Sequence, residues 1–371
     1  MAKETTGSAE SKYLAALSAL VLGQHANDSV AERSPQFEDA LAFVASLDDV
    51  DLHQLLHLAE VHHVTVRFIE AIQGANGRMQ SLARRLAAPF DAEHERIANA
   101  LVFVRRICEA FDDAGMPITV IKSLDHWPDL GGDIDLYTSG DRDKVVDLFR
   151  RRFGAILEPQ SWGDRLANKW NFKLPGLPEL VECHVRWLGQ TGEQVALAKR
   201  LEERRVRRRI RDYEFPMPAP EERIIVATLQ RMYRHFYIRL CDIANVANLV
   251  RGREIDFTEL RKTADLGAIW PGVATLLVIV SQYVRAYGGD EISLPSQVLA
   301  AAKFNREKTY VNKQFVCIPI LPQAAELYTQ QMIGIGASHN FRSMLRLSLL
   351  PALATAAFVG FRLTGSDKGI W

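Results

Sequence analysis

The sequence predicts an α+β fold in which a small mixed sheet is flanked by N- and C-terminal helical regions. Apolar residues recur at helical spacing before about residue 90 and again after about residue 215. Between these regions, short β-rich runs are separated by glycine and proline. We expect a disordered leader at 1–12, an N-terminal helical region at 13–92, an α/β core at 93–215 and a C-terminal helical domain at 216–371.

The N-terminal region shows two helix starts. Ser34-Pro35 combines an N-cap residue with a first-turn proline, and Asp51 precedes apolar residues at helical spacing. Four histidines, at 53, 57, 62 and 63, lie in or just after the second helix. His53 and His57 share a helix face, but no HExxH frame accompanies them. We therefore favour solvated or core histidines over a metal site.

The predicted core combines helices with short strands. A long helix is expected at about 91–114, where Gly115 ends it in the left-handed conformation. Ser139 is expected to cap a helix at about 141–152 that ends at Gly154. Extended runs occur at 118–121, 133–137, 155–157, 169–174 and 179–187. Proline and glycine between the last two runs predict a hairpin.

Composition indicates a globular protein without a bulk attraction to nucleic acid or membrane. Lys plus Arg and Asp plus Glu each number 45. The four cysteines are far apart and form no CxxC pair, which fits a reducing compartment. The first residues are polar and contain no apolar signal segment. We therefore expect a cytoplasmic protein. The most apolar stretch, 347–361, has 15 residues, whereas a membrane span needs about 20. We expect it to form a buried helix, with no transmembrane segment.

Paired carboxylates carry the strongest chemical signal. On a strand, Asp133 and Asp135 point to one face and Ile134 and Leu136 to the other. Carboxylates held in parallel repel one another unless a cation lies between them. Mg²⁺ prefers such oxygen ligands together with water and substrate phosphate. The pattern predicts a metal site.

A later strand supplies the third acid. Glu182 and His184 alternate with apolar residues within 180–187. If this strand lies beside the first acidic strand, Glu182 completes a site for two metal ions that suits in-line attack on an α-phosphate. His184 is expected either to orient a ligand or to line the cleft.

Basic and small residues near these acids are candidates for binding phosphate. Lys122 and Ser123 follow the first strand at a turn, where backbone N–H groups, a hydroxyl and an ammonium can bind the β- and γ-phosphates. Lys173, or Lys169 on the same strand, is a candidate to reach a triphosphate.

The arrangement resembles the nucleotidyltransferase superfamily of the polymerase-beta type. In that superfamily, a small-residue turn precedes an Asp-hydrophobic-Asp strand and a later acid follows. It resembles more closely the branch of uncharacterised nucleotidyltransferases. Matching segments run from about residue 40 to about residue 265: Lys122 before the DIDL of 133–136, LLHLAEVHHV at 55–64, Glu182, His184 and Trp187, and His235 with Asp242-Ile243-Ala244.

The resemblance implies a nucleotidyltransferase core and a metal-dependent reaction. The enzyme would use Mg²⁺ or Mn²⁺ to transfer a nucleoside monophosphate from an NTP, with ATP the expected one, to an unidentified small molecule, protein or RNA, releasing pyrophosphate. Asp133 and Asp135 would hold the metals, and Glu182 would also deprotonate the acceptor. Two departures are Ser123, where the family has glycine, and Gly131-Gly132, where an arginine is expected.

These departures keep two other functions open. The first is a catalytically inactive nucleotide-binding or scaffold protein with the same fold. The second is an RNA-binding module that uses the basic run at 199–211, although this run contains no aromatic residues for base stacking. A solvated, internally paired segment explains the run equally well.

Overall fold

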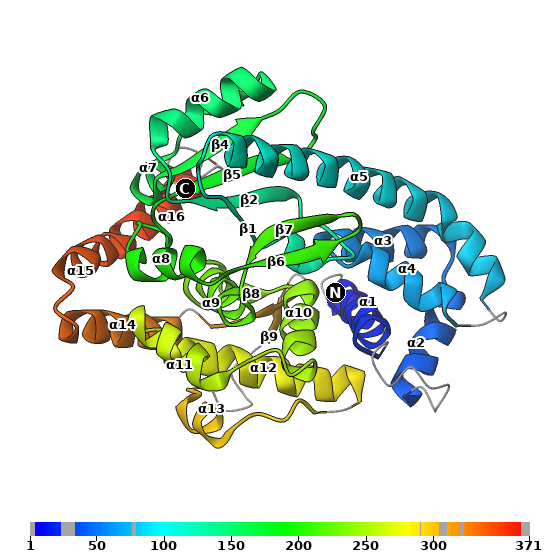
Figure 1. Ribbon diagram of the computed structural model, residues 1–371. Helices are drawn as coiled ribbons and strands as arrows, with labels where there is room; N and C mark the ends of the chain where they lie inside the picture. Colours follow the sequence, from blue (N-terminus) through cyan, green and yellow to red (C-terminus); the bar gives the residue numbers. More distant parts are fainter. Residues whose placement is uncertain are drawn as a thin grey trace.

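A computed structural model describes residues 4–23, 34–75, 79–289, 291–303, 310–312, 314–319 and 323–364. It has the predicted α+β architecture, with a small mixed sheet among helices (Figure 1). The five-stranded sheet has the order β1-β2-β5-β4-β3, in which β2 and β5 are parallel and the other neighbours antiparallel. Its strands are β1 (Thr119–Ile121), β2 (Asp133–Thr138), β3 (Ile156–Leu157), β4 (Lys169–Lys173) and β5 (Leu180–Val185).

The two faces of this sheet have different roles. Ile134 and Leu136 point into an apolar core that the helices α5 (Gln80–Asp113) and α6 (Arg142–Phe153) complete. Figure 1 shows both helices on one side of the sheet. The opposite face carries the acidic side chains and is bordered by α8 (Val195–Glu203) and α9 (Pro220–Gln230). The alternation of acidic and apolar residues along β2 thus directs the apolar side chains into the core and the acidic ones to the opposite face, as predicted.

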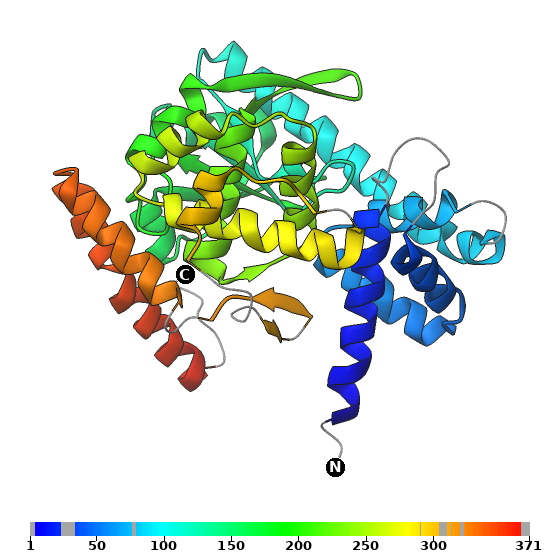
Figure 2. The same ribbon diagram turned by 90° about the horizontal axis from the view of Figure 1, so that it is seen from below.

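The N- and C-terminal helical regions share one apolar core, although the sequence places them on opposite sides of the sheet unit. Helix α1 packs against α12, and the two lie together in Figure 2. The helices are α1 (Glu4–Leu22), α2 (Pro35–Ala45), α3 (Asp49–Val61), α4 (Thr65–Gln73), α10 (Leu240–Arg251), α11 (Phe257–Leu266), α12 (Trp270–Gly288) and α13 (Ser296–Ala301). Because apolar faces from both ends of the chain bury each other, neither region has a core of its own.

The remaining elements are short turns of helix, short strands and the C-terminal helices. They are η2 (Ser123–His126), α7 (Trp162–Ala167), η3 (Arg231–His235), β6 (Arg205–Ile210), β7 (Tyr213–Pro218), β8 (Tyr237–Ile238), β9 (Tyr310–Asn312), β10 (Phe315–Cys317), α14 (Ala325–Ala337), α15 (Phe341–Ser348) and α16 (Leu350–Thr364). Strands β6 and β7 form an antiparallel hairpin, and β7 crosses the boundary expected at 215.

Capping residues in the sequence predicted some helix ends correctly and others incorrectly. Ser34 caps α2 and Gly154 ends α6 in the left-handed conformation, as predicted. Asp141 rather than Ser139 caps α6, because its carboxylate accepts the N–H groups of residues 143 and 144. Helix α1 begins at Glu4, inside the segment 1–12 expected to be disordered. An established helix extends at low cost into polar residues, which explains this difference.

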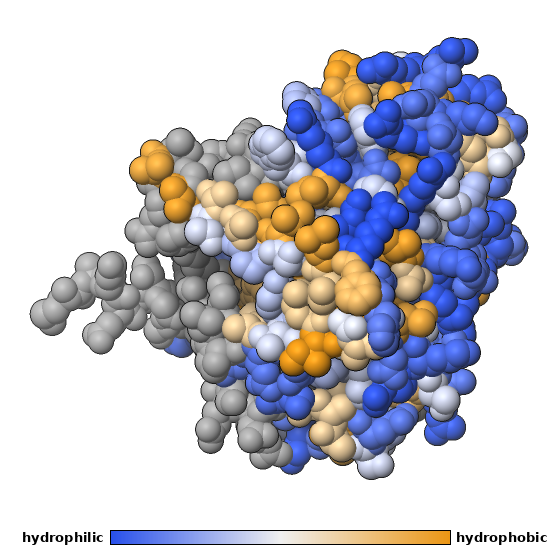
Figure 3. Space-filling model, turned by 90° about the vertical axis from the view of Figure 1, so that its left-hand side faces the viewer, coloured by the Kyte–Doolittle hydropathy of each residue, from blue (hydrophilic) through white to orange (hydrophobic). Residues whose placement is uncertain are grey.

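The C-terminal helix is not buried, contrary to the prediction for 347–361. Pro351 and Ala352 are exposed on α16, and Leu349 just before it is 40% exposed. Figure 3 shows apolar side chains on this side of the molecule. Among the side chains whose burial the structure describes, α15 buries Ser343 and Leu347 and α16 buries none, and periodicity alone could not reveal that. Among the described residues, no helix combines the length and the apolar character that a membrane span requires.

Candidate active site

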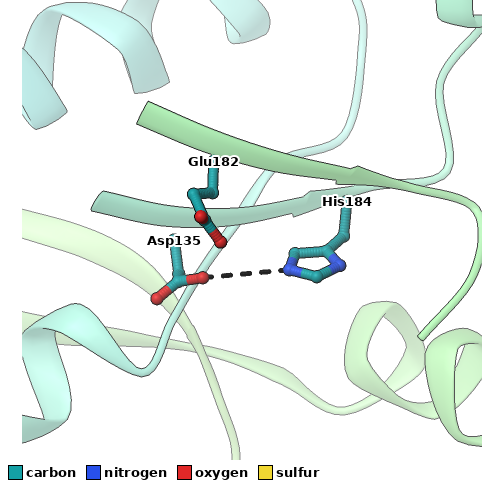
Figure 4. Close-up of side chains that lie close together, drawn as sticks. All are labelled: Asp135, Glu182 and His184. Carbon is teal, nitrogen blue, oxygen red and sulfur yellow. Dashed lines mark ion pairs between the residues drawn. The ribbon is translucent and has the colours of Figure 1, made fainter. Parts of the chain in front are cut away.

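Three side chains from two neighbouring parallel strands converge on one face of the sheet. Asp135 on β2 lies directly opposite Glu182 on β5, and His184 is two residues further along β5. One ligand atom from each lies within 4.8 Å of the others. Figure 4 shows the three side chains gathered at these two strands. Carboxylate oxygens and an imidazole nitrogen form a donor set for a divalent cation.

Asp133 lies at the beginning of β2, opposite Leu180, and borders this group without belonging to it. Burial, followed by the charges of Asp135 and Glu182, raises the pKa of Asp133 to about 6. The four predicted acid and histidine positions therefore share a face, but the tight group contains His184 in place of Asp133.

Lys122 reaches this group from an unusual backbone conformation. Its φ of 58° and ψ of −62° lie where residues other than glycine are strained. Its ammonium contacts the carboxylate of Asp135. Burial acts to raise the pKa of Asp135, but Lys122 and His184 outweigh burial and hold it well below its ordinary range. The Asp135 carboxylate is thus ionised throughout the physiological pH range.

Ser123 holds the acidic strand in place. Its hydroxyl donates to the carbonyl of Asp133 over 3.1 Å and accepts the N–H of Asp135 over 2.7 Å. The hydroxyl that the sequence analysis assigned to phosphate is therefore bonded to the backbone of β2. A glycine at this position would lack both hydrogen bonds, so Ser123 has a structural use here that the resemblance did not predict.

Lys169, rather than Lys173, faces the acids. Antiparallel pairing sets Lys169 opposite His184, and its ammonium lies 3.1 Å from Glu182 and 3.0 Å from Asp164. Lys173 is further along β4, is 64% exposed and pairs with Glu158 over 2.9 Å. Both lysines share a strand face, but only the register between β4 and β5 decides which one reaches the site.

His184 is buried with both ring nitrogens lacking a hydrogen bond among the described residues. Its Nε2 lies 3.8 Å from a carboxylate oxygen of Asp135, too far for a hydrogen bond. Burial lowers the pKa of His184, which keeps the ring neutral. A neutral, unpaired imidazole beside two carboxylates fits a metal ligand, since only an unprotonated nitrogen can bind a metal ion.

One comparison with known proteins gives a match. A family model described as an uncharacterised nucleotidyltransferase matches residues 48–283, more than half of the chain. The chain belongs to this nucleotidyltransferase family. The match covers β1 to β5 and therefore all the site residues named above. No curated protein and no solved structure matches the chain.

A cavity of about 540 Å³ opens beside the acidic group of this family member. Lys122 and His184 line one end of it. The other walls come from α9, η3, α14, α15 and α16. A volume of this size accommodates a small molecule. The C-terminal helices thus form part of the wall of a cavity that Lys122 and His184 also line.

Arg234 and His235 line the same cavity and extend the site. Arg234 forms no hydrogen bond or ion pair with any residue that the structure describes, whereas the nearby Arg231 pairs with Asp242 over 2.6 Å. Burial lowers the pKa of His235 to about 2, so this ring is neutral. Sequence analysis matched His235 to the family but missed Arg234. The sequence signal for Arg234 was weak. Arg234 lies in η3, a single π-helical turn, and such turns often mark functional sites once the structure shows them.

The other polar motifs serve the fold. His62 accepts the N–H of Leu240 and lies 2.9 Å from the carbonyl of Gln314, which places it in the buried core as the sequence analysis favoured. His235 and Asp242, which share a helical spacing in the sequence, are divided between η3 and α10, and Asp242 pairs with Arg231 instead. These contacts join elements around the sheet and do not face the acidic group.

The basic run at 199–211 is largely compensated by acids. Arg204 lies 2.7 Å from Glu221, 3.3 Å from Glu222 and 3.2 Å from Glu259. Arg200 contacts Glu222 and Glu259 as well. The run divides between α8 and β6, and the side chains that pair with glutamates belong to α8 and the residue that follows it. This arrangement favours the internally paired segment over an RNA-binding module.

Proposed function

We propose that this protein transfers a nucleoside monophosphate from an NTP, with ATP the first candidate, to an acceptor hydroxyl and releases pyrophosphate. The observation that carries the proposal is the convergence of Asp135, Glu182 and His184 within 4.8 Å on one sheet face. The membership of a nucleotidyltransferase family supports it. The acceptor oxygen forms a bond to the α-phosphorus, and the bond from that phosphorus to pyrophosphate breaks.

In this proposal, Asp135, Glu182 and His184 hold Mg²⁺ or Mn²⁺, and Asp133 adds a further carboxylate at the edge of the group. The buried ring of His184, which has no hydrogen bond among the described residues and whose pKa burial lowers, supports this assignment. A bound divalent cation would lower the charge on the phosphates and favour ionisation of the acceptor hydroxyl. Glu182 is our candidate to take the acceptor proton.

Lys122, Lys169 and Arg234 are the residues that we assign to the phosphates. Lys122 and Lys169 neutralise Asp135 and Glu182 in the free chain, and Arg234 lines the adjoining cavity with a charge that no described residue pairs. Anionic phosphate oxygens are the ligands that such ammonium and guanidinium groups bind. Lys173 was assigned to this role from the sequence, but it pairs with Glu158, and we therefore do not assign it to the phosphates.

The test is label transfer from α-³²P-labelled NTPs, with Mg²⁺ or Mn²⁺, to components of a cell extract. We expect labelled product from the parent chain and none from Asp135→Asn. Asp143→Asn is the matched control, because Asp143 is exposed on α6 and away from the site. Product formation that survives Asp135→Asn contradicts this site. Binding of NTP without transfer under any condition supports the inactive scaffold instead.

A further inference from the structure

The 540 Å³ cavity has a mainly apolar lining that also includes Lys122, His184 and Arg234. Lys122 and His184 both lie beside Asp135, so this part of the lining adjoins the acidic group. The rest of the lining is mainly aliphatic and aromatic and comes from segments far apart in the chain. Its apolar members include Leu188, Val226, Leu229, Phe236, Tyr328, Leu347 and Leu350. A molecule that fills this cavity meets the site at one end and apolar side chains elsewhere.

The cavity lining also contains one acid, Glu193, whose carboxylate accepts hydrogen bonds from the N–H and the hydroxyl of Thr191. Lys122 is in contact with Asp135, and Arg234 acts electrostatically on both Lys169 and His235, so its charge lies on the side of the acids. His235 is neutral because burial lowers its pKa to about 2. Removing an apolar body from water into the remaining walls is favourable by about 25 cal/mol per Å².

We propose that this cavity is the acceptor site and that the acceptor is a small molecule with an apolar body and a hydroxyl group, its hydroxyl directed to the Lys122 and His184 end. This inference rests on the proposed nucleotidyl transfer. The reaction joins the acceptor oxygen to the α-phosphorus of the NTP, releases pyrophosphate and passes the hydroxyl proton to a carboxylate of the site. The product is a nucleotidylated alcohol.

The surroundings of the cavity disfavour a polymeric acceptor. Nucleic acid needs cations along its backbone, but the densest basic run is divided between α8 and β6, and Arg200 and Arg204 are engaged by glutamates. The cavity is walled by β-sheet residues, α9, η3 and the C-terminal helices. Leu347 and Leu350 are part of this wall, and their apolar side chains favour an apolar ligand over a polyanion.

The experiment uses the full chain and two matched pairs of variants that place tryptophan on a helix. Ala325→Trp and Ala354→Trp fill the cavity from α14 and α16. Thr329→Trp and Ala356→Trp change exposed positions of the same helices outside the lining. Binding is followed with the neutral fluorophore N-phenyl-1-naphthylamine and its displacement by 1-octanol, 2-phenylethanol or glycerol. Transfer of label from α-³²P-ATP to the same three alcohols is measured with Mg²⁺.

We expect saturable fluorophore binding that octanol and phenylethanol displace and glycerol does not. Both cavity-filling variants should weaken binding at least tenfold and lose label transfer to the two apolar alcohols, whereas their controls keep both. ATP binding, measured separately by calorimetry, should be unchanged in all four. Fluorophore binding that is equal in filling and control variants overturns the inference. Loss of ATP binding on filling also overturns it, because the cavity then holds the nucleotide.

The two proposals fail in different ways. If the parent chain binds no ATP but octanol displaces the fluorophore, the nucleotidyl transfer is refuted and the role as an acceptor site falls with it, while the cavity remains an apolar binding site. If ATP binds and label reaches RNA or protein but neither apolar alcohol, the transfer stands and the small-molecule acceptor is refuted.

Discussion

The ammonium of Lys169 lies 3.1 Å from the carboxylate of Glu182, across neighbouring strands of the sheet. Burial acts to lower the pKa of Lys169, but Glu182 and Asp164 together outweigh burial and the pKa is raised, so the ammonium stays charged. Both side chains are largely buried. A charged lysine held beside an acid of the candidate site has two uses: it neutralises the acid in the free chain and it can bind phosphate.

We predict that Lys169→Met raises the KM for NTP, or lowers transfer, by about 10- to 100-fold, since a charge-assisted hydrogen bond contributes about 1.5–3 kcal/mol. Lys173→Met is the control on the same strand, because Lys173 is 64% exposed and pairs with Glu158. Steady-state kinetics of both variants check the prediction. Equal effects of the two changes would show that the register of β4 does not determine the phosphate contact.

These two lysines also show what the sequence could and could not predict about the site. Period-two alternation placed Asp133 and Asp135 on one face, because a strand dictates this locally. Which of the two lysines faces Glu182 depends on the pairing of β4 with β5, and a shift in register is invisible in either strand alone. Arg234 comes from a distant part of the chain, so only the tertiary structure brings it to the site.

The fold was predictable to the same extent. Ser34 and Gly154 delimit helices through their own side chain or backbone conformation, and both were read correctly. The shared core of the N- and C-terminal helices was not predictable, because the apolar face of a helix does not reveal which other helix it packs against. The exposure of α16 escaped prediction for the same reason.

Ser123→Ala should destabilise the protein by about 1–3 kcal/mol, because it leaves the buried N–H of Asp135 without its hydrogen bond. Urea denaturation measures this change. Thr138→Ala, which removes a hydrogen bond at the far end of the same strand, is a reference for a purely structural loss. If Ser123→Ala keeps its stability but raises the KM for NTP, the hydroxyl binds phosphate rather than the strand.

His184→Leu should weaken Mn²⁺ binding more than Mg²⁺ binding. Imidazole is a better ligand for transition metals than for Mg²⁺, which prefers oxygen. Calorimetric titration of both ions into the parent and the variant measures the difference. His63→Leu is the control, because His63 is stacked on His126 and is bonded to Arg239 outside the proposed ligand group. An unchanged ratio of the two affinities would exclude His184 as a ligand.

Arg204→Ala should lower the stability of the chain and leave its affinity for RNA unchanged. Removing this arginine takes an ion-pair partner from the buried Glu221 and Glu222, and loss of a partner by a buried charge costs about 3–5 kcal/mol, an upper value for this partly exposed arginine. Arg209→Ala, at an exposed position of β6, should change little. Retention of RNA that depends on salt and disappears in both variants would revive the RNA-binding module.

Stability should decrease in acid because of His62. Burial lowers the pKa of His62 to about 4, so its ring is neutral in the folded chain, while the unfolded chain binds a proton below about pH 6.5. The neutral His62 ring therefore contributes fully to the free energy of unfolding above about pH 6.5. This contribution is lost as the pH falls towards 4, by up to about 1.4 kcal/mol per pH unit.

In His62→Gln, we expect a lower free energy of unfolding at pH 7 but a shallower decline between pH 6.5 and 4. His57→Gln should follow the parent, because His57 is 67% exposed. Urea denaturation at several pH values gives these slopes, and a decline in His62→Gln as steep as that of the parent would assign the acid sensitivity to other groups.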